Sequence, residues 1–270
     1  MKYAVLFLAA GLAAAPALAQ RMDIQPIPDL PIKSVPPASA PTPPPSEWQV
    51  SVGGGVSDAP RYEGSAYNRL RFMPLLEASN GRLFVSILRG VGYNFSGDRN
   101  FEYGLRLAPG HARRQSADPR LYGMGDIGYS IEPGAFLNMR FAPWYVSSGI
   151  STGVHGTHAD LGTGIGLPLS GADRLRLGIN LNWGGAQYNQ TYFGVTSAQA
   201  AASGNVLTAY DAGAGVKDYA LTANWAHNYD KNWFSSAGMS YKWLVGSARY
   251  SPLTQRNSMR AINFVLGYRY

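Results

Sequence analysis

The chain has 270 residues, of which only 14% are charged, well below the roughly 25% of a typical soluble domain. It holds 32 glycines and 17 tyrosines, a composition more typical of a membrane β-barrel than of a cytosolic enzyme. It has no cysteine, which excludes a small scaffold held together by disulfides, and its formal net charge is +7.

The first twenty residues, MKYAVLFLAAGLAAAPALAQ, have the three parts of a signal peptide. Lys2 supplies the positive start, residues 5–15 form a short apolar core, and Ala17-Leu18-Ala19 is a small-x-small cleavage site. We therefore predict a signal peptide over 1–19 and an exported mature chain beginning at Gln20. An exported chain does not meet nucleic acid, so the positive charge is interpreted as solubility plus contact with anionic lipid headgroups.

Residues 20–46 form a proline-rich tether, with nine of the 18 prolines between positions 26 and 45. Proline fixes φ and removes a backbone donor, so this segment is predicted to be an extended, polyproline-like chain on the periplasmic side. It is either a passive spacer or a docking segment for a periplasmic partner, and the composition favours the spacer.

From position 47 onward the sequence alternates between apolar and polar residues with period 2, which predicts membrane-spanning strands. In residues 173–183, DRLRLGINLNW, one face carries Leu, Ile and Trp and the other carries Arg, Gly and Asn. Eleven residues, at about 3.3 Å each and tilted by about 45°, cross a membrane. The predicted strands are 47–57, 68–78, 82–95, 100–110, 121–132, 135–142, 144–154, 160–169, 173–184, 217–229, 232–245 and 259–270.

These segments predict an all-β fold, a closed antiparallel transmembrane β-barrel over residues 47–270. Aromatic residues gather near strand ends, and in lipid every backbone group must pair, so the strands must close. We expect about twelve strands, or ten if "IEPGAF" at Pro133-Gly134 is a kink in one strand rather than a turn. An even count places both ends of the barrel in the periplasm, SGAD and DKN in short periplasmic turns, and 57–68, 185–216 and 246–258 in external loops.

The stretch Tyr192–Asp218 is long, poor in charge and rich in alanine and glycine. Its SAQAAAS segment predicts a short helix. We expect the loop to fold into or across the external mouth of the barrel, with Tyr192, Phe193 and Tyr210 as aromatic anchors.

Several pieces of the chain resemble the MipA/OmpV family of outer-membrane proteins. They run in family order: APRYEGSAYNRLRFMPLLEA, GVGYNF, RRQSADPRLYGMGDI, YNQTYFGVTSAQAAASG, LTAYDAGAGVKDYAL, LVGSARYSPLTQR and the terminal YRY. The resemblance covers nearly all of the mature chain but not the proline-rich tether. It implies a barrel in the outer membrane of a Gram-negative cell, surrounded by lipid and lipopolysaccharide. Some members are described as scaffolds joining a lytic transglycosylase to a penicillin-binding protein, others as adhesins, and the family carries no catalytic motif.

The polar faces of the predicted strands carry charged residues that are candidates for the lumen lining. They either line a solute path or pair across a narrow lumen and close it, and the second alternative is favoured. The candidates are Arg69, Arg71, Glu102, Arg106, Arg174, Arg176 and Asn180.

One cluster has residue types suited to catalysis or metal binding: Ser151, His155, His158 and Asp160, predicted to span a turn. Histidines in glycine-rich turns are more often simple polar turn residues, so we assign no catalytic, cofactor or metal site. The last strand, with Phe264, Tyr268 and Tyr270 on one face, resembles the C-terminal signal for the barrel-assembly machinery. The sequence thus favours a non-enzymatic scaffold or surface-interaction barrel. The alternatives are a small-solute channel and a lipid-modifying barrel enzyme.

Overall fold

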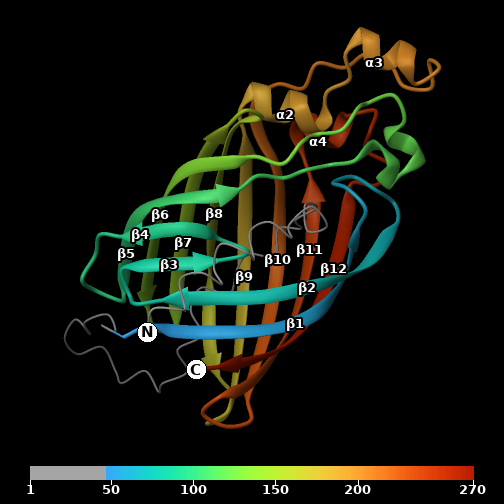
Figure 1. The fold of residues 1–270 in the computed structure, drawn as a ribbon. Coiled ribbons are helices and arrows are strands. Elements are labelled where there is room, and N and C mark those ends of the chain that lie inside the picture. The colour runs from blue at the N-terminus through green and yellow to red at the C-terminus, as the bar shows by residue number, and fades with distance from the viewer. Residues whose placement is uncertain (1–46) are drawn as a thin grey trace, which may run out of the picture.

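The computed structural model describes residues 47–270, which form a closed antiparallel barrel of twelve strands (Figure 1). Each strand pairs with its neighbours in the sequence, and β1 closes the barrel on β12. The strands are β1 (Gln49–Pro60), β2 (Asn68–Ser79), β3 (Leu83–Ser86), β4 (Gly90–Asn94), β5 (Phe101–Pro109), β6 (Ile131–Phe141), β7 (Trp144–Gly153), β8 (Gly156–Pro168), β9 (Asp173–Gly184), β10 (Gly215–Asn228), β11 (Trp233–Leu244) and β12 (Ser258–Arg269).

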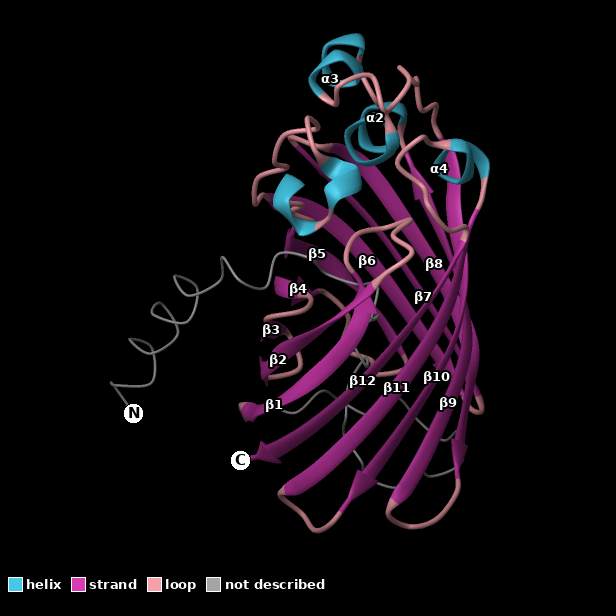
Figure 2. Cartoon of the chain, turned by 90° about the vertical axis from the view of Figure 1, so that its right-hand side faces the viewer, coloured by secondary structure: helices cyan, strands magenta, loops and turns pink. Residues whose placement is uncertain are grey.

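The two ends of the barrel differ, as Figures 1 and 2 show. The start of β1, the C-terminus and short connections such as 169–172 and 229–232 lie at one end, the turn end. At the other end, the loop end, lie α2 (Ala186–Phe193), α3 (Ser197–Ala202), α4 (Gly246–Tyr250) and two 3-10 helices, η2 (Gln115–Ala117) and η3 (Pro119–Leu121). Among residues 47–270, no helix has the length and apolarity needed to cross a membrane.

The outer face of the barrel is apolar, because the period-2 alternation sends every second side chain outward. Large side chains such as Phe72, Ile131, Ile179 and Met239 remain more than half exposed on it. Aromatic side chains sit outward near both ends, for example Trp144 and Trp233 at the turn end. An apolar band flanked by aromatic residues is the surface that a bilayer covers.

The predicted strand 82–95 is wrong, because the structure forms a tight hairpin of β3 and β4 there. The hairpin turns at residues 87–89, where the Ser86 hydroxyl accepts hydrogen bonds from the Leu88 and Arg89 backbone N–H groups. Gly90 follows with φ of 84°, a left-handed conformation that glycine adopts at little cost. The alternation alone did not mark this turn.

The predicted strand 121–132 is also wrong, since residues 110–130 form a loop-end connection containing η2 and η3. "IEPGAF" contains no turn, and Pro133 lies within β6. The β6–β7 ladder begins at Gly134. Pro133 therefore lies just outside this ladder, where its missing N–H removes no hydrogen bond between β6 and β7. One strand lost and one gained leave the predicted count of twelve correct. The loop 110–130 was not among the predicted external loops.

Candidate functional site

Four connections meet over the loop end of the lumen and form a cap, which we define as residues 61–67, 110–130, 185–214 and 245–257. Two clusters of buried side chains hold it together. The first includes Ile127, Tyr188 and Leu244, and the second includes Tyr62, Val195 and Leu253. Because each cluster draws on several connections, the cap is a packed layer across the mouth (Figure 2).

The three residues predicted as mouth anchors lie inside this cap. Tyr192 and Phe193 are buried, Phe193 completely, while Tyr210 is partly buried and packs against both clusters. The Tyr192 hydroxyl donates to the carbonyl of His111, and the Tyr210 hydroxyl donates to the Ser247 carbonyl at 2.9 Å. The aromatic side chains therefore join the 185–214 connection to two other connections.

The helix predicted in SAQAAAS is confirmed as α3, which begins at the first serine of that segment, Ser197. Thr196 is the N-cap, and its hydroxyl accepts from the Gln199 backbone N–H at 3.2 Å. The Gln199 side chain in turn accepts from the Thr196 backbone N–H, which completes a capping box, and donates to the Met124 carbonyl at 2.8 Å. This last bond fixes α3 to the 110–130 connection.

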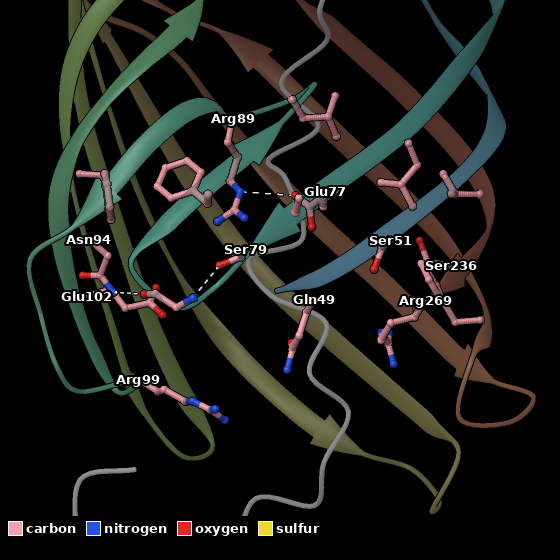
Figure 3. A pocket seen from close by; sticks show the side chains of 18 of the residues that line it. Gln49, Ser51, Glu77, Ser79, Arg89, Asn94, Arg99, Glu102, Ser236 and Arg269 are labelled. Atoms are coloured by element: carbon pink, nitrogen blue, oxygen red, sulfur yellow. Dashed lines mark hydrogen bonds and ion pairs between the residues drawn. The ribbon is translucent and has the colours of Figure 1, made fainter. Parts of the chain in front are cut away.

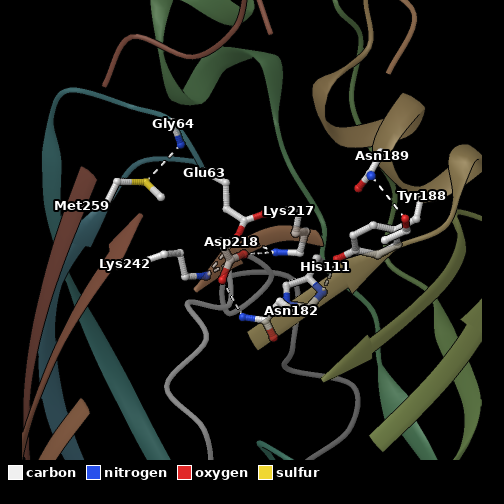
Figure 4. Close-up of polar contacts among 11 residues, drawn as sticks. Glu63, Gly64, His111, Asn182, Tyr188, Asn189, Lys217, Asp218, Lys242 and Met259 are labelled. Atoms are coloured by element: carbon white, nitrogen blue, oxygen red, sulfur yellow. Dashed lines mark hydrogen bonds and ion pairs between the residues drawn. The ribbon is translucent and has the colours of Figure 1, made fainter. Parts of the chain in front are cut away.

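Where the cap meets the barrel wall lies a largely buried cluster of four charges, two cationic and two anionic (Figure 4). Lys217 Nζ is 2.9 Å from Glu63 Oε1 and 2.6 Å from Asp218 Oδ2. Lys242 Nζ is 3.0 Å from the same Glu63 oxygen, and Asn182 donates to Asp218 Oδ1 at 2.6 Å. We call Glu63, Lys217, Asp218 and Lys242 the charge cluster.

The charge cluster depends on an irregularity at the start of β10. The β9–β10 register shifts between Val216 and Asp218, so the consecutive residues Lys217 and Asp218 are both buried rather than on opposite faces. Asp218 is fully buried, and a buried charge is tolerated only when it is paired and hydrogen-bonded. The charge cluster was not predicted from the sequence. Its only local signal was the pair of adjacent charges in GVKDY, which breaks the strand alternation.

The candidate catalytic or metal-binding residues do not all lie in one turn, as the sequence predicted. β8 begins at Gly156, so His158 and Asp160 lie in a strand, and His158 pairs across the ladder with Ser151. His158 Nδ1 is 3.7 Å from the buried Glu132 Oε2. His155 instead lies in the tight turn before β8, where its ring nitrogen contacts the Gly128 carbonyl at 3.0 Å.

Ser151 is buried, with 1% of its surface exposed, and the His158 ring packs against Tyr188 with a centroid separation of 4.8 Å. Among residues 47–270, no three histidine, aspartate or glutamate side chains gather closely enough to hold a metal ion. The arrangement joins the wall to α2.

Three of the predicted lumen-lining residues form ion pairs or hydrogen bonds with other residues of the barrel. Arg106 Nη2 is 3.7 Å from Asp160 Oδ1, and Glu102 Oε2 is 3.3 Å from Arg140 Nη2. Arg71 donates to the Arg61 carbonyl at 3.2 Å.

The other predicted lining residues lie on β2 and β9. Arg176 sits over the Tyr145 ring, with 5.9 Å between its Cζ atom and the ring centroid. Asn180 is buried, whereas Arg69, at the loop-end start of β2, is exposed. Arg174 lies on the same face of β9 as Arg176, opposite Ala226 of β10.

The interior also contains a cavity of about 150 Å³ near the turn end (Figure 3). It is lined by residues from both sides of the β1–β12 closure, including Ser51 and Val265, and by the β3–β4 hairpin. We call it the turn-end chamber. None of the four residues of the charge cluster lines this chamber.

Residues 52–270 match the family described as MltA-interacting protein MipA. This chain belongs to the MipA family. The match begins within β1 and includes every later strand and all four connections of the cap. The MipA match leaves out the proline-rich tether predicted for 20–46, which also lies outside the residues that the structure describes.

No curated protein sequence matches this MipA-family chain. Among solved structures, it is similar to an outer-membrane channel from Pseudomonas putida F1, with 10% identity, a TM-score of 0.42, and coverage of 88% of this chain and 100% of that one. It is also similar to a bacterial polysaccharide outer-membrane secretin, with 11% identity, a TM-score of 0.41, and coverage of 83% and 99%. At these values the similarities say nothing about what the MipA-family barrel binds or conducts.

Proposed function

We propose that this chain is an outer-membrane barrel of a Gram-negative cell that is closed toward the exterior. It acts as a membrane anchor and scaffold for murein-processing enzymes, and carries out no chemistry of its own. The partners we expect are a lytic transglycosylase, as the family's description as MltA-interacting suggests, and a penicillin-binding protein. The observation that carries the proposal is the cap, a packed layer over the mouth of a barrel whose outer face is apolar.

The orientation follows from the two ends of the barrel. Bacterial outer-membrane barrels have short periplasmic turns and longer external loops. The turn end of this barrel, with the start of β1 and the C-terminus, is therefore assigned to the periplasm, where murein enzymes work. The loop end carries the exposed arginines Arg114, Arg249 and Arg256, which suit the phosphate groups of lipopolysaccharide.

The cap and the charge cluster favour a scaffold over an open channel. Ions cross a pore through a continuous wet path, whereas here buried aromatic side chains cover the mouth and a largely buried, charge-balanced cluster joins the cap to the wall. The strands are also few enough for side chains to fill much of the interior. We expect the folded barrel to conduct weakly or not at all.

The proposal is tested in two measurements on the same protein. Crosslinking in intact envelopes followed by pulldown is expected to recover a lytic transglycosylase and a penicillin-binding protein. Single-channel recording of the refolded barrel in planar bilayers is expected to show no sustained open state. A barrel that conducts steadily and recovers neither enzyme would overturn the scaffold in favour of a small-solute channel.

The proline-rich tether is tested with the same pulldown. If 26–46 is a passive spacer, deleting it leaves both barrel folding and recovery of the enzymes unchanged. Loss of the enzymes from a barrel that still folds would show that the tether is the docking segment.

A further inference from the structure

The turn-end chamber combines apolar walls with charged side chains. Its walls include Leu75 of β2, Phe84 of β3, Phe136 of β6, and Phe234 and Val265 of β11 and β12. Phe84 and Phe136 meet edge to face, with ring centroids 5.6 Å apart. Small-molecule sites typically have this composition, mostly apolar with a few charged or polar groups.

Four arginines line the chamber, and two of them have carboxylate partners. Arg89 Nε is 3.4 Å from Glu77 Oε1, and Arg140 Nη2 is 3.3 Å from Glu102 Oε2. Within each of these two pairs, the charges of the arginine and the glutamate cancel. They lie on the strands and the hairpin that form the β2–β6 side of the chamber.

The other two arginines, Arg99 and Arg269, have no ion pair within residues 47–270. Arg269 Nε and Nη2 and Arg99 Nε are buried and have no hydrogen-bond partner there. The guanidinium of Arg269 lies over the Phe234 ring, 5.1 Å from its centroid. A buried donor left without an acceptor is costly, so these nitrogens are the groups in the chamber that an anion would satisfy.

The charge and size of the chamber define the ligand. It is lined by four arginines and by three carboxylates, those of Glu77, Asp98 and Glu102. The excess of one positive charge matches a ligand with a single negative charge. A volume of about 150 Å³ is enough for a benzene-sized group. Guanidinium groups bind carboxylates through paired hydrogen bonds.

We propose that the turn-end chamber binds a monocarboxylate with a compact apolar body, whose carboxylate is held by Arg269. The apolar body packs against Phe84, Phe136 and Phe234. Figure 3 shows Arg99 and Arg269 below Arg89 and Glu77, on the turn-end side of the chamber. The ligand therefore enters from the turn end, which the proposed orientation places in the periplasm, and it does not need to pass the cap.

The proposal is tested by calorimetry on the full mature barrel in lipid nanodiscs, with empty nanodiscs as the blank. Phenylacetate is the probe, and 2-phenylethanol and 2-phenylethylamine are neutral and cationic molecules of similar size. We expect phenylacetate to bind, the alcohol to bind much more weakly and the amine not to bind. Arg269→Gln is expected to weaken phenylacetate binding about 10- to 100-fold, since it removes a hydrogen-bonded charge pair.

Matched variants separate the site from general effects. Arg82→Gln changes an exposed arginine in the β2–β3 turn that does not line the chamber, and it should leave binding unchanged. Val265→Phe fills the chamber without changing its charge, and it should abolish binding. Heat-modifiable gel migration checks that each variant is folded.

Three results would overturn the proposal. They are no measurable phenylacetate binding to the folded native barrel, equal binding of acid and alcohol, or equal weakening by Arg269→Gln and Arg82→Gln. Because the test does not involve a murein enzyme, its failure leaves the proposed scaffold function standing.

Discussion

Buried Lys217 at the start of β10 and half-buried Glu63 in the first loop-end connection form an ion pair with 2.9 Å between Nζ and Oε1. The pair links residues 154 positions apart and fastens the cap to the barrel wall. Lys242 and Asp218 complete the cluster, so each charge has a partner of opposite sign.

The first prediction concerns this charge cluster. Lys217→Met leaves Glu63 and Asp218 sharing Lys242 alone, and removing one partner of a buried ion pair typically costs about 3–5 kcal/mol. We expect a loss of about 3 kcal/mol in the free energy of unfolding, because Lys242 compensates in part. Urea unfolding of the barrel in lipid vesicles measures it.

Lys231→Met is the control, since Lys231 is exposed in the β10–β11 turn and should cost almost nothing. The double variant Lys217→Met with Glu63→Gln restores charge balance, and its cost should be less than the sum of the two single costs. Additive costs would mean that the pair does not couple the cap to the wall.

A second prediction concerns which part of the 185–214 connection closes the mouth of the barrel. Replacing residues 186–212 with a short Gly-Ser linker removes Tyr188, Tyr192 and Phe193 from the mouth. We expect this variant to conduct in planar bilayers, because Gly184 and Gly215 are paired neighbours that a short turn can join. Replacing only 197–206 removes α3, whose residues are largely exposed, and should leave conductance unchanged. Equal conductance from both variants and the native barrel would rule out the cap as the seal.

A third prediction concerns two glycines of the 110–130 connection. Gly123 and Gly125 both have positive φ, at 82° and 73°, so alanine introduces similar backbone strain at each. A Cβ on Gly123 would lie 2.6 Å from the Ala202 carbonyl carbon of α3, whereas a Cβ on Gly125 meets nothing within 4 Å.

We therefore expect Gly123→Ala, and not Gly125→Ala, to detach α3 from the 110–130 connection. The measurement is the rate of protease cleavage at the loop end of the folded barrel. The interpretation fails if the two variants are cleaved at the same rate.

A fourth prediction concerns alkaline pH. Burial raises the pKa of Tyr62 and Tyr192 above the usual value, with smaller contributions from Asp118 at Tyr62 and Glu132 at Tyr192. Above about pH 10 an unfolded cap loses these protons while the folded cap keeps them. The stability from the two tyrosines is thus fully present below pH 10 and falls as the pH rises.

Arg113 acts in the opposite direction, since burial lowers its pKa to about 10, but one arginine opposes two tyrosines. We expect protease cleavage of the cap to increase between about pH 10 and 12. The variant with Tyr62→Phe and Tyr192→Phe should show a smaller increase, and an unchanged pH profile in that variant would count against the two tyrosines.

A fifth prediction concerns the predicted assembly signal, Phe264, Tyr268 and Tyr270. In the structure Tyr268 pairs with Val52 of β1 and with Trp233 of β11, and the Tyr270 backbone N–H donates to the Val50 carbonyl at 2.9 Å. Deleting residues 268–270 should abolish heat-modifiable gel migration because it shortens the closing ladder. Tyr270→Phe keeps the backbone and the ring and should migrate normally. A truncated barrel that still shifts on heating would show that closure does not need this end of β12.

The sequence by itself determined the class of fold, because period-2 alternation depends only on which face of a strand each residue occupies. It also identified the family, the count of twelve strands and the aromatic residues Tyr192, Phe193 and Tyr210. It failed at the β3–β4 hairpin and at 110–130, where glycine conformation and loop packing, rather than alternation, decide the path of the chain.

Only the tertiary structure decided which connections meet at the mouth and which charges are buried together. Glu63 and Lys217 carry no local signal of each other, since their pairing depends on barrel closure and on the register shift in β10. The same closure brings Arg269 and Phe234 to one side of the turn-end chamber and Arg99 to another. Periodicity reports the face of each strand, but only the closed barrel sets the distances across its interior.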